Sequence, residues 1–232
     1  MNRIAKLGLG FFLLVLPARA QTISPVIVEY QEKARGSFQI RNDAFVPLTV
    51  VLEAKSFSVD AKGEPLYRSL DPEIRLELSA KSFRVGPQQT YTVFYRASAE
   101  VLPAWFTIYA SITGPTAPNG IKLVLELPHT VYLLTRQPLD GGAIVFHRAG
   151  TGGPKAQVTL EVENRSQQFG RVREVEITSA TARKTYPGFP FFPRQRRTLV
   201  FDWDQEGVPA KVVLKFNKFQ VEQLIRPPSY VP

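Results

Sequence analysis

IKLVLELPHTVYLLT, residues 121–135, is the stretch that decides the fold. In its first half, apolar residues stand at every second position: Ile121, Leu123, Leu125 and Leu127. Side chains two positions apart leave an extended chain on the same face, so this pattern predicts a half-buried β-strand. Pro128 lacks a backbone N–H, which a central strand tolerates poorly, and part of this strand is therefore expected at a sheet edge or at a bulge.

An apolar strand edge invites pairing with another chain unless something covers it. Two interpretations of residues 121–135 follow. In the first, the segment is the last strand of a sandwich and is buried by its own domain. In the second, its edge is offered to a partner, which adds a strand to it. The sequence alone leaves both open.

The rest of the chain has the texture of an all-β protein. Short runs rich in Val, Ile, Phe, Tyr and Thr alternate with Pro, Gly, Asn and Asp, and no window keeps a helical period over several turns, so helices are expected to be nearly absent. Before the stretch above, strands are expected at residues 26–30, 36–41, 48–57, 74–79, 82–85, 90–96 and 105–113. After it, strands are expected at residues 143–148, 157–164, 172–180, 197–203 and 211–219.

A turn-rich segment, QPLDGG at residues 137–142, separates the two series and predicts a bent connection between domains. The chain is therefore divided into a signal segment at residues 1–20, a first sandwich at residues 21–137 and a smaller second sandwich at residues 138–232. Within the second sandwich, YPGFPFFP at residues 186–193 is expected to be a loop. Such an aromatic loop either caps its own core or forms an exposed contact surface.

The first 20 residues predict export. Arg3 and Lys6 precede an apolar run, which ends before a small-residue cleavage pattern at residues 18–20. That run is too short to span a bilayer, and no later segment has about 20 uninterrupted apolar residues, so no membrane span is expected. Because the chain has no cysteine, its cores rather than disulfides must hold the exported protein together.

The mature chain is moderately basic. Removal of Arg3, Lys6 and Arg19 takes three of the 29 basic residues and leaves 26 against 20 acidic ones, a net charge of +6. Export argues against nucleic acid as the partner, and anionic envelope surfaces or acidic protein grooves suit the charge better. Scattered charge that only keeps the protein soluble is the simpler alternative.

Little in the sequence suggests catalysis. His129 and His147 are the only histidines, neither belongs to a metal-binding spacing, and both lie in or beside apolar strands, so structural roles are expected. Asp202 and Asp204 stand two positions apart, where they either hold a cation or form a solvated strand end. The tripeptide at residues 164–166 matches a glycosylation sequon, which is a weak pattern. We expect no enzyme activity, no metal and no cofactor.

Several segments, taken in order along the chain, carry a resemblance to a known family. They are FQIRND at residues 38–43 followed by Pro47 and the strand at 48–54, VGPQQTYTVFYR at residues 85–96, Leu102-Pro103 ahead of residues 106–112, VEN at residues 162–164, and the turn at Phe192-Pro193. Their order is similar to that in the PapD-like periplasmic chaperones of chaperone-usher pilus assembly. The resemblance implies two immunoglobulin-like domains set as a boomerang, a periplasmic location and a non-catalytic chaperone role.

The resemblance also implies a binding mechanism. In this family, a pilin subunit lacks the last strand of its own fold, and the chaperone lends the last strand of its first domain to fill the gap. The matching residues are Leu123, Leu125 and Leu127, so the expected partners are pilin-like or surface-fibre subunits, with an outer-membrane usher as a further candidate. A structural or adhesive envelope protein with this fold but no chaperone activity is the alternative, and an enzyme is a third.

One feature of the family's binding cleft is expected to be missing. The family holds a carboxylate with an Arg on the first strand and a Lys near the end of the donor strand, and these positions carry Val26 and Tyr132 here. Arg136 matches a basic position that the family uses at the domain junction, and Lys33 and Arg35 are further candidates to approach the cleft. Tyr132 and Arg136 therefore join the three leucines as expected subunit-binding residues.

Overall fold

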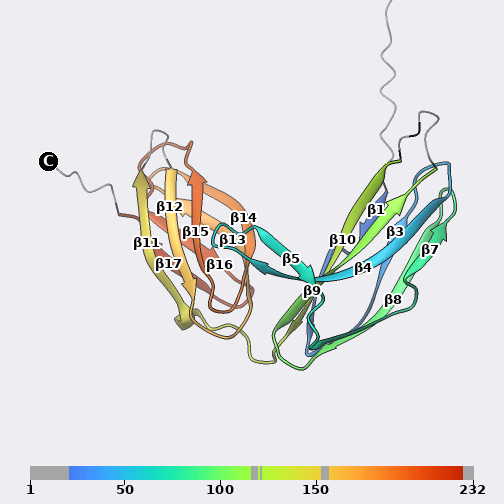
Figure 1. Ribbon diagram of the computed structural model, residues 1–232. Coiled ribbons are helices and arrows are strands. Elements are labelled where there is room, and N and C mark those ends of the chain that lie inside the picture. The colour runs from blue at the N-terminus through green and yellow to red at the C-terminus, as the bar shows by residue number, and fades with distance from the viewer. Residues whose placement is uncertain (1–20, 116–119, 121, 153–156, 227–232) are drawn as a thin grey trace, which may run out of the picture.

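The computed structural model describes residues 21–115, 120, 122–152 and 157–226, and in these residues the chain is built almost entirely of strands (Figure 1). Among the described residues, the one helical element is a short 3₁₀ turn, Gly141–Ala143. The expected signal segment at residues 1–20 lies outside the described residues. The prediction of an all-β fold with two immunoglobulin-like sandwiches in a boomerang arrangement is confirmed.

Two sheets form the first sandwich. The outer sheet has the order β1-β3-β8-β6. Its strands are β1 (Thr22–Ser24), β3 (Lys33–Arg41), β8 (Thr90–Ala99) and β6 (Ile74–Leu78). The junction sheet has the order β2-β10-β9-β4-β5, and β7 also pairs with β4. Its strands are β2 (Ile27–Gln31), β10 (Val124–Leu134), β9 (Ala104–Thr113), β4 (Leu48–Val59), β5 (Pro65–Ser69) and β7 (Ser82–Val85).

The core of the first sandwich fills the space between these sheets. Its largest fully buried side chains include Phe38, Phe106, Ile108 and Leu133. Along β10, odd-numbered residues point into this core and even-numbered residues point to the opposite face of the junction sheet, as the period of two predicts. The expected strand at residues 121–135 is thus confirmed with slightly shorter bounds.

The second sandwich has seven strands among its described residues, where about five were expected. One sheet contains β11 (Ile144–Gly152), β12 (Gln157–Asn164) and β15 (Arg196–Asp202). The other contains β14 (Arg183–Phe191), β13 (Gly170–Thr178), β16 (Lys211–Lys215) and β17 (Gln220–Leu224). The strands of the first sandwich end at Leu134 and those of the second begin at Ile144. A division at residue 137 remains a prediction.

The expectation of a loop at residues 186–193 is wrong, because most of this segment belongs to β14. Pro187 and Pro190 are tolerated because β14 is an edge strand that pairs only with β13. Gly188 lies so close to β13 that a Cβ atom there would stand 1.9 Å from the carbonyl oxygen of Val172. The glycine thus permits the close approach of β14 to β13.

Each sandwich is tied together by one buried asparagine at the end of a strand. In the first, Asn42 is fully buried, and its Nδ2 donates to the carbonyl oxygens of Val46, Val85 and Gly86 at 2.9, 3.2 and 2.9 Å. The backbone N–H of Asn42 donates to Gln89 at 2.9 Å. One side chain therefore joins the loop after β3 to the turn after β7.

Asn164 repeats this arrangement in the second sandwich. It is also fully buried, and its Nδ2 donates to the carbonyl oxygens of Gln168 and Phe192 at 2.8 and 3.0 Å. Its backbone N–H donates to Gln195 at 2.9 Å, as that of Asn42 does to Gln89. Because the amide is enclosed and engaged, the sequon at residues 164–166 is a structural element and no acceptor for a glycan.

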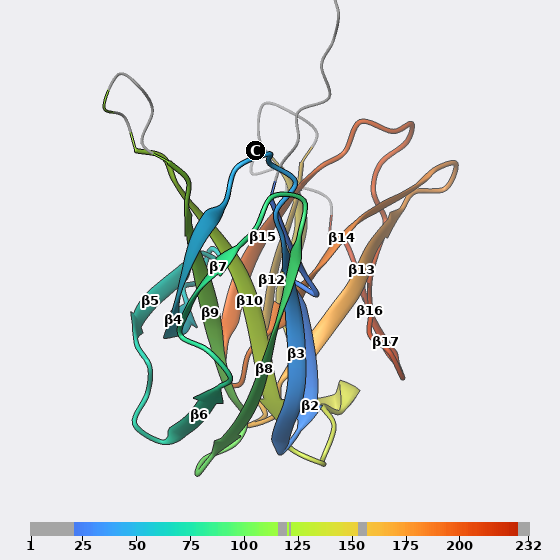
Figure 2. The ribbon, with the colours of Figure 1, turned by 90° about the vertical axis from the view of Figure 1, so that its right-hand side faces the viewer.

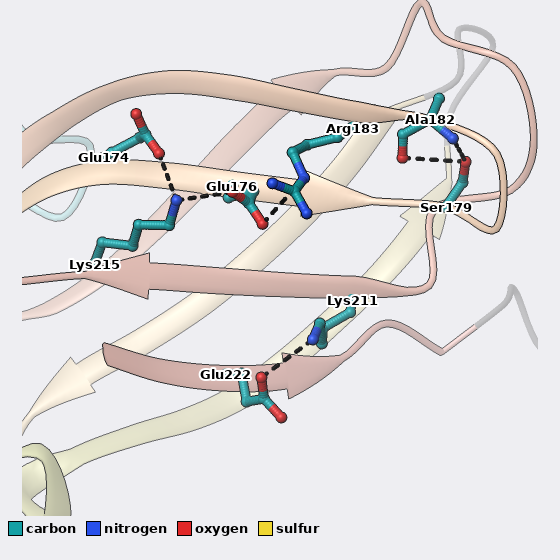
Figure 3. A network of polar contacts seen from close by, with 8 residues as sticks. All are labelled: Glu174, Glu176, Ser179, Ala182, Arg183, Lys211, Lys215 and Glu222. Carbon is teal, nitrogen blue, oxygen red and sulfur yellow. Dashed lines mark hydrogen bonds and ion pairs between the residues drawn. The ribbon is translucent and has the colours of Figure 1, made fainter. Parts of the chain in front are cut away.

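In the second sandwich, the exposed face of the sheet β14-β13-β16-β17 carries a ladder of paired charges (Figure 3). Lys215 lies between Glu174 and Glu176, with 2.8 Å to each carboxylate. Lys211 pairs with Glu222 at 3.2 Å on the adjacent strand. The hydrogen bond from Lys215 holds the pKa of Glu176 below its usual value. These charges are paired with one another, so this part of the surface does not suggest a ligand site.

Candidate functional site

The first half of β10, residues 124–129, has one unpaired side. β9 pairs with β10 along Val124–Leu133. On the opposite side, β2 pairs with β10 only from Thr130 to Leu134, and no other described strand takes its place before Thr130. We call this unpaired side of residues 124–129 the open edge. It agrees with the sequence-based expectation that part of the segment lies at a sheet edge.

The backbone groups at the open edge can be assigned from the neighbouring hydrogen bonds. Thr130 donates its N–H to the carbonyl oxygen of Val26 on the β2 side at 2.7 Å. Backbone groups alternate between the two sides of a strand, so Val124 and Glu126 direct their N–H and C=O groups to the open edge. Pro128 directs only a C=O there. The missing N–H of Pro128 therefore removes no hydrogen bond between β10 and β9.

The expected donor leucines lie beside this edge. Leu125 and Leu127 point inward and are half-buried against the rim of the first core. Leu123 precedes the strand and is 78% exposed. Ile121 lies outside the described residues.

Further apolar side chains are exposed around the open edge. Val26, Ile27 and Val124 are each about half exposed, at 48%, 50% and 53%. Val26 and Ile27 stand where β2 begins, next to the last residues of the edge. An unpaired strand bordered by exposed apolar side chains is a template for strand addition.

A buried hydrogen-bonded chain fixes the point at which the open edge ends. The Nδ1 atom of His129 lies 2.6 Å from the carbonyl oxygen of Pro25, and its Nε2 atom lies 3.0 Å from the hydroxyl of Tyr95. Since a carbonyl only accepts, Nδ1 carries the proton and Nε2 accepts from Tyr95. Tyr30 continues the chain at 3.2 Å from the Tyr95 hydroxyl. His129 thus holds the crossing from β1 to β2 against β10.

Burial dominates the electrostatics of this chain. It lowers the pKa of His129, although the bond to Pro25 opposes part of the effect. It also raises the pKa of Tyr95. Gly36 makes room for the two tyrosines, because a Cβ atom there would lie 2.1 Å from the Tyr30 hydroxyl. His129 has both nitrogens engaged, which is a structural role.

Four aromatic side chains from both sandwiches form the domain junction. Phe57 and Tyr132 come from the junction sheet, Phe169 and Phe192 come from the second sandwich, and all four are buried. The ring centroids of Tyr132 and Phe169 are 4.8 Å apart, and those of Phe57 and Phe192 are 6.1 Å apart. Tyr132 is therefore 4% exposed and lies beneath the second sandwich.

Arg171 supplies a cation at this junction that the sequence did not predict. Its Nε atom lies 2.5 Å from the carboxylate of Glu29, and its guanidinium lies 5.1 Å from the ring centre of Tyr132. Glu29 and Arg171 are 142 positions apart in the chain. No local motif signals such a pair, because it arises only when the two sandwiches meet.

Arg136 lies at the rim of a cleft of ≈ 500 Å³ between the two sandwiches. It is largely exposed and pairs with Glu32 at 2.9 Å. The cleft is lined by Arg171 and Arg136, whereas Lys33 and Arg35 do not line it. Both point outward from β3 in the outer sheet, contrary to the expectation that one of them approaches the cleft.

The hairpin of β4 and β5 reaches across to the second sandwich (Figure 1). Its turn is held by Asp60, whose Oδ1 accepts backbone N–H groups from Lys62, Gly63 and Glu64. On the other side of the junction, Arg197 donates to the carbonyl oxygen of Lys62 at 3.3 Å. The two sandwiches therefore contact each other both through the aromatic cluster and through this turn.

The described residues contain no group of three or more His, Cys, Asp or Glu side chains that could hold a metal ion. His147 pairs with Glu163 at 2.7 Å. Asp204 binds Lys184 at 2.8 Å, which lowers the pKa of Asp204. In the part of the chain that the structure describes, no helix is long and apolar enough to cross a membrane.

No protein-family model matches the chain, and no curated protein sequence matches it either. Solved structures of similar fold include several chaperones. The class 5 fimbriae chaperone CfaA is 11% identical over 90% of this chain and 100% of its own, with a TM-score of 0.54. The YadV chaperone is 13% identical over 88% and 98%, with a TM-score of 0.56. The SafB chaperone, solved with the Salmonella enterica SafA pilin, is 12% identical over 89% and 96%, with a TM-score of 0.55.

Proposed function

We propose that this chain is an exported, non-catalytic chaperone that binds subunits of a pilus or another surface fibre by lending them the open edge of β10. The unpaired side of residues 124–129 is the observation that carries the proposal. A subunit that lacks a strand adds its own backbone to this edge, and main-chain hydrogen bonds then hold it.

Leu123, Leu125 and Leu127 supply the apolar part of the binding. Leu123 is exposed and the other two are half-buried, so each has surface left to cover. Full burial of a leucine contributes about 1.5–3 kcal/mol, before the cost of ordering the partner. The SafB structure with its pilin supports a subunit as the partner. The periplasm follows as the place of action, and an outer-membrane usher is a further proposed partner.

The alternative is a structural or adhesive envelope protein with this fold and no chaperone activity. That alternative expects residues 121–127 to be covered by the chain itself. The unpaired side of residues 124–129 favours the chaperone.

The test is a Leu125→Asp variant, which puts an unpaired charge into an apolar groove of the partner. We expect it to stay folded and to lose capture of fibre subunits, measured by co-purification from the periplasm of cells that produce them. Leu66→Asp is the matched control, since Leu66 is 59% exposed on β5 at another edge of the same sheet. It should capture subunits as the parent does. Equal capture by the Leu125→Asp variant would show that residues 121–127 are merely an internal strand.

Arg136→Ala tests whether a carboxylate anchor exists in the cleft. Arg136 is exposed and already paired with Glu32, so its loss is expected to weaken capture only modestly. Tyr132, buried beneath Phe169, is expected to act by holding the junction rather than by touching the subunit. Complete loss of capture in the Arg136→Ala variant would instead place a charged anchor at the rim of the cleft.

A further inference from the structure

The outer sheet carries two arginines that face each other without an acidic partner. Arg35 on β3 stands directly opposite Arg96 on β8, and both are exposed on the outer face of the sheet. Like charges directly opposite each other on a sheet destabilise it. Among the described residues, neither guanidinium forms an ion pair or a hydrogen bond. Glu77 stands opposite Arg96 on β6, yet its carboxylate forms no ion pair with it.

Two other arginines on the first sandwich have acidic partners. Arg75 lies 3.1 Å from Glu100, and Arg41 lies 2.7 Å from Asp43. The ladder on the second sandwich is likewise satisfied within its own sheet (Figure 3). Arg35 and Arg96 differ from these arginines, because each stands opposite a like charge and neither has an acidic partner within ion-pair distance among the described residues.

An exposed aromatic ring lies next to this pair. Phe94, one residue pair along from Arg96 on the same face of β8, is 61% exposed. Ser37 stands opposite it on β3, and Ser79 exchanges two hydrogen bonds with its backbone at 2.8 and 3.0 Å. These small side chains leave a hollow of ≈ 590 Å³ whose lining includes Phe94, both arginines and Glu77.

Nothing in the described chain covers this face. In Figure 2, β3 and β8 lie side by side on the side nearest the viewer, β6 lies next to β8, and the second sandwich lies behind them. The face therefore points away from the domain junction. The open edge belongs to the other sheet of the sandwich, so a partner at each can be bound independently.

We propose that this face, made of Arg35, Arg96 and Phe94, is a docking surface for an acidic segment of a second protein. Exposed aromatic and arginine side chains together are typical of protein interfaces. The two guanidinium groups provide paired donors for one carboxylate, and the hollow beside Phe94 accepts one apolar side chain. A lipid surface is less suitable, since it needs an apolar face of several side chains where this sheet offers one ring.

The geometry also limits the sequence of the docking segment. Residues on one face of a strand repeat at about 6.6 Å, and Phe94 and Arg96 are separated by one such step. An extended segment with an apolar residue and an acidic residue two positions later matches both halves of the site. This surface goes beyond the proposed chaperone function and does not depend on it.

The experiment uses the mature protein and a short peptide with Leu, Glu and Glu at alternate positions in a Ser and Gly background. Amide chemical shifts should change on β3, β8 and β6 when the peptide is added. We expect R35Q/R96Q to weaken binding about tenfold or more, because charge-assisted hydrogen bonds are lost. Arg75→Gln is the matched control on the same face, and it should leave the affinity within about twofold.

Three outcomes of the binding experiment would overturn the proposal. These are the absence of shift changes on the outer sheet, equal affinity of R35Q/R96Q and the parent, and binding to phosphatidylglycerol vesicles but not to the peptide. Thermal melts show whether Arg35 and Arg96 instead stabilise the sheet. R35Q/R96Q should melt at or above the temperature of the parent, because the repulsion is removed. A lower melting temperature would mean that the arginines stabilise the sheet and would contradict a docking role.

Discussion

At the scale of single residues, Asn42 and Asn164 are positions where a small substitution should greatly lower the free energy of unfolding. Each amide donates to several carbonyl groups, and alanine removes all of these hydrogen bonds, although Gly86 and Phe192 keep a backbone donor. A hydrogen bond contributes about 0.5–1.5 kcal/mol and a buried acceptor left without any partner costs about 1–3 kcal/mol, so each Asn→Ala variant should lose about 3 kcal/mol of unfolding free energy. Denaturant titration measures this loss.

Asn217 is the control for both variants, because its side chain is exposed and accepts one bond from Arg173. Asn217→Ala should stay within about 0.5 kcal/mol of the parent. A loss as small as this in the Asn42→Ala or Asn164→Ala variant would mean that water replaces the amide.

His129 predicts a dependence of stability on pH. Burial places its pKa below the usual value near 6.5, so the unfolded chain binds the proton more readily than the folded chain does. The free energy of unfolding should therefore fall as the pH drops from about 6.5, by up to about 1.4 kcal/mol per pH unit. Denaturant titrations at pH 7 and pH 5 measure the effect.

The variant His129→Gln should be less stable than the parent at pH 7. Its free energy of unfolding should fall less than that of the parent between pH 7 and pH 5. His147→Gln is the control, since His147 lies near the surface beside Glu163 and leaves the buried chain intact. It should keep the pH dependence that arises from His129. If the His129→Gln variant keeps that dependence in full, another group is responsible.

At the scale of elements, the sequence predicted most strands because a period of two shows wherever one face is buried. Strand β10 is the clearest case, since its leucines alternate and Pro128 marks an edge. The short strands β1, β5 and β17 were missed. Every residue of β5 is exposed, so no buried face gives it an alternating pattern.

Strand β14 shows why turn residues can mislead. Pro187, Gly188 and Pro190 suggest a loop, but position in the sheet decides the outcome. An edge strand does not need the missing N–H groups, and the glycine allows close pairing. Which strand is at an edge is a property of the whole sheet, so local sequence cannot supply it.

In the candidate site, too, features set by neighbouring residues were predicted, whereas contacts between distant residues were not. The shared face of Leu125 and Leu127 follows from their spacing alone. The contact of Arg171 with Glu29 and Tyr132 joins residues from different sandwiches and has no local pattern. Sequence reasoning therefore located the strand edge but gave an incomplete account of the cleft.

At the scale of the whole molecule, the aromatic cluster couples the two sandwiches. Phe192→Ala removes a ring that contacts Phe57 and Phe169, and such truncations cost about 3–5 kcal/mol. We expect calorimetry to resolve two transitions in place of one coupled transition. Cleavage by protease in residues 135–142 should also become faster, because the junction no longer shields them.

Phe191→Ala is the matched control for this prediction. Phe191 is fully buried in the core of the second sandwich and lies outside the junction cluster. Its truncation should lower stability without faster cleavage at residues 135–142. Faster cleavage in both variants to the same extent would assign the effect to the second core rather than to the junction.

Pro128 has a consequence for how long a partner stays bound. A strand that adds at the open edge meets two backbone groups from Val124, two from Glu126 and one from Pro128, where an unbroken strand would offer a further donor. The ladder is thus short and stops at the proline. Differences in affinity between related complexes reside mostly in dissociation rates. We therefore expect a strand bound as proposed to dissociate from this end first and to be replaced by a competitor that forms a longer ladder.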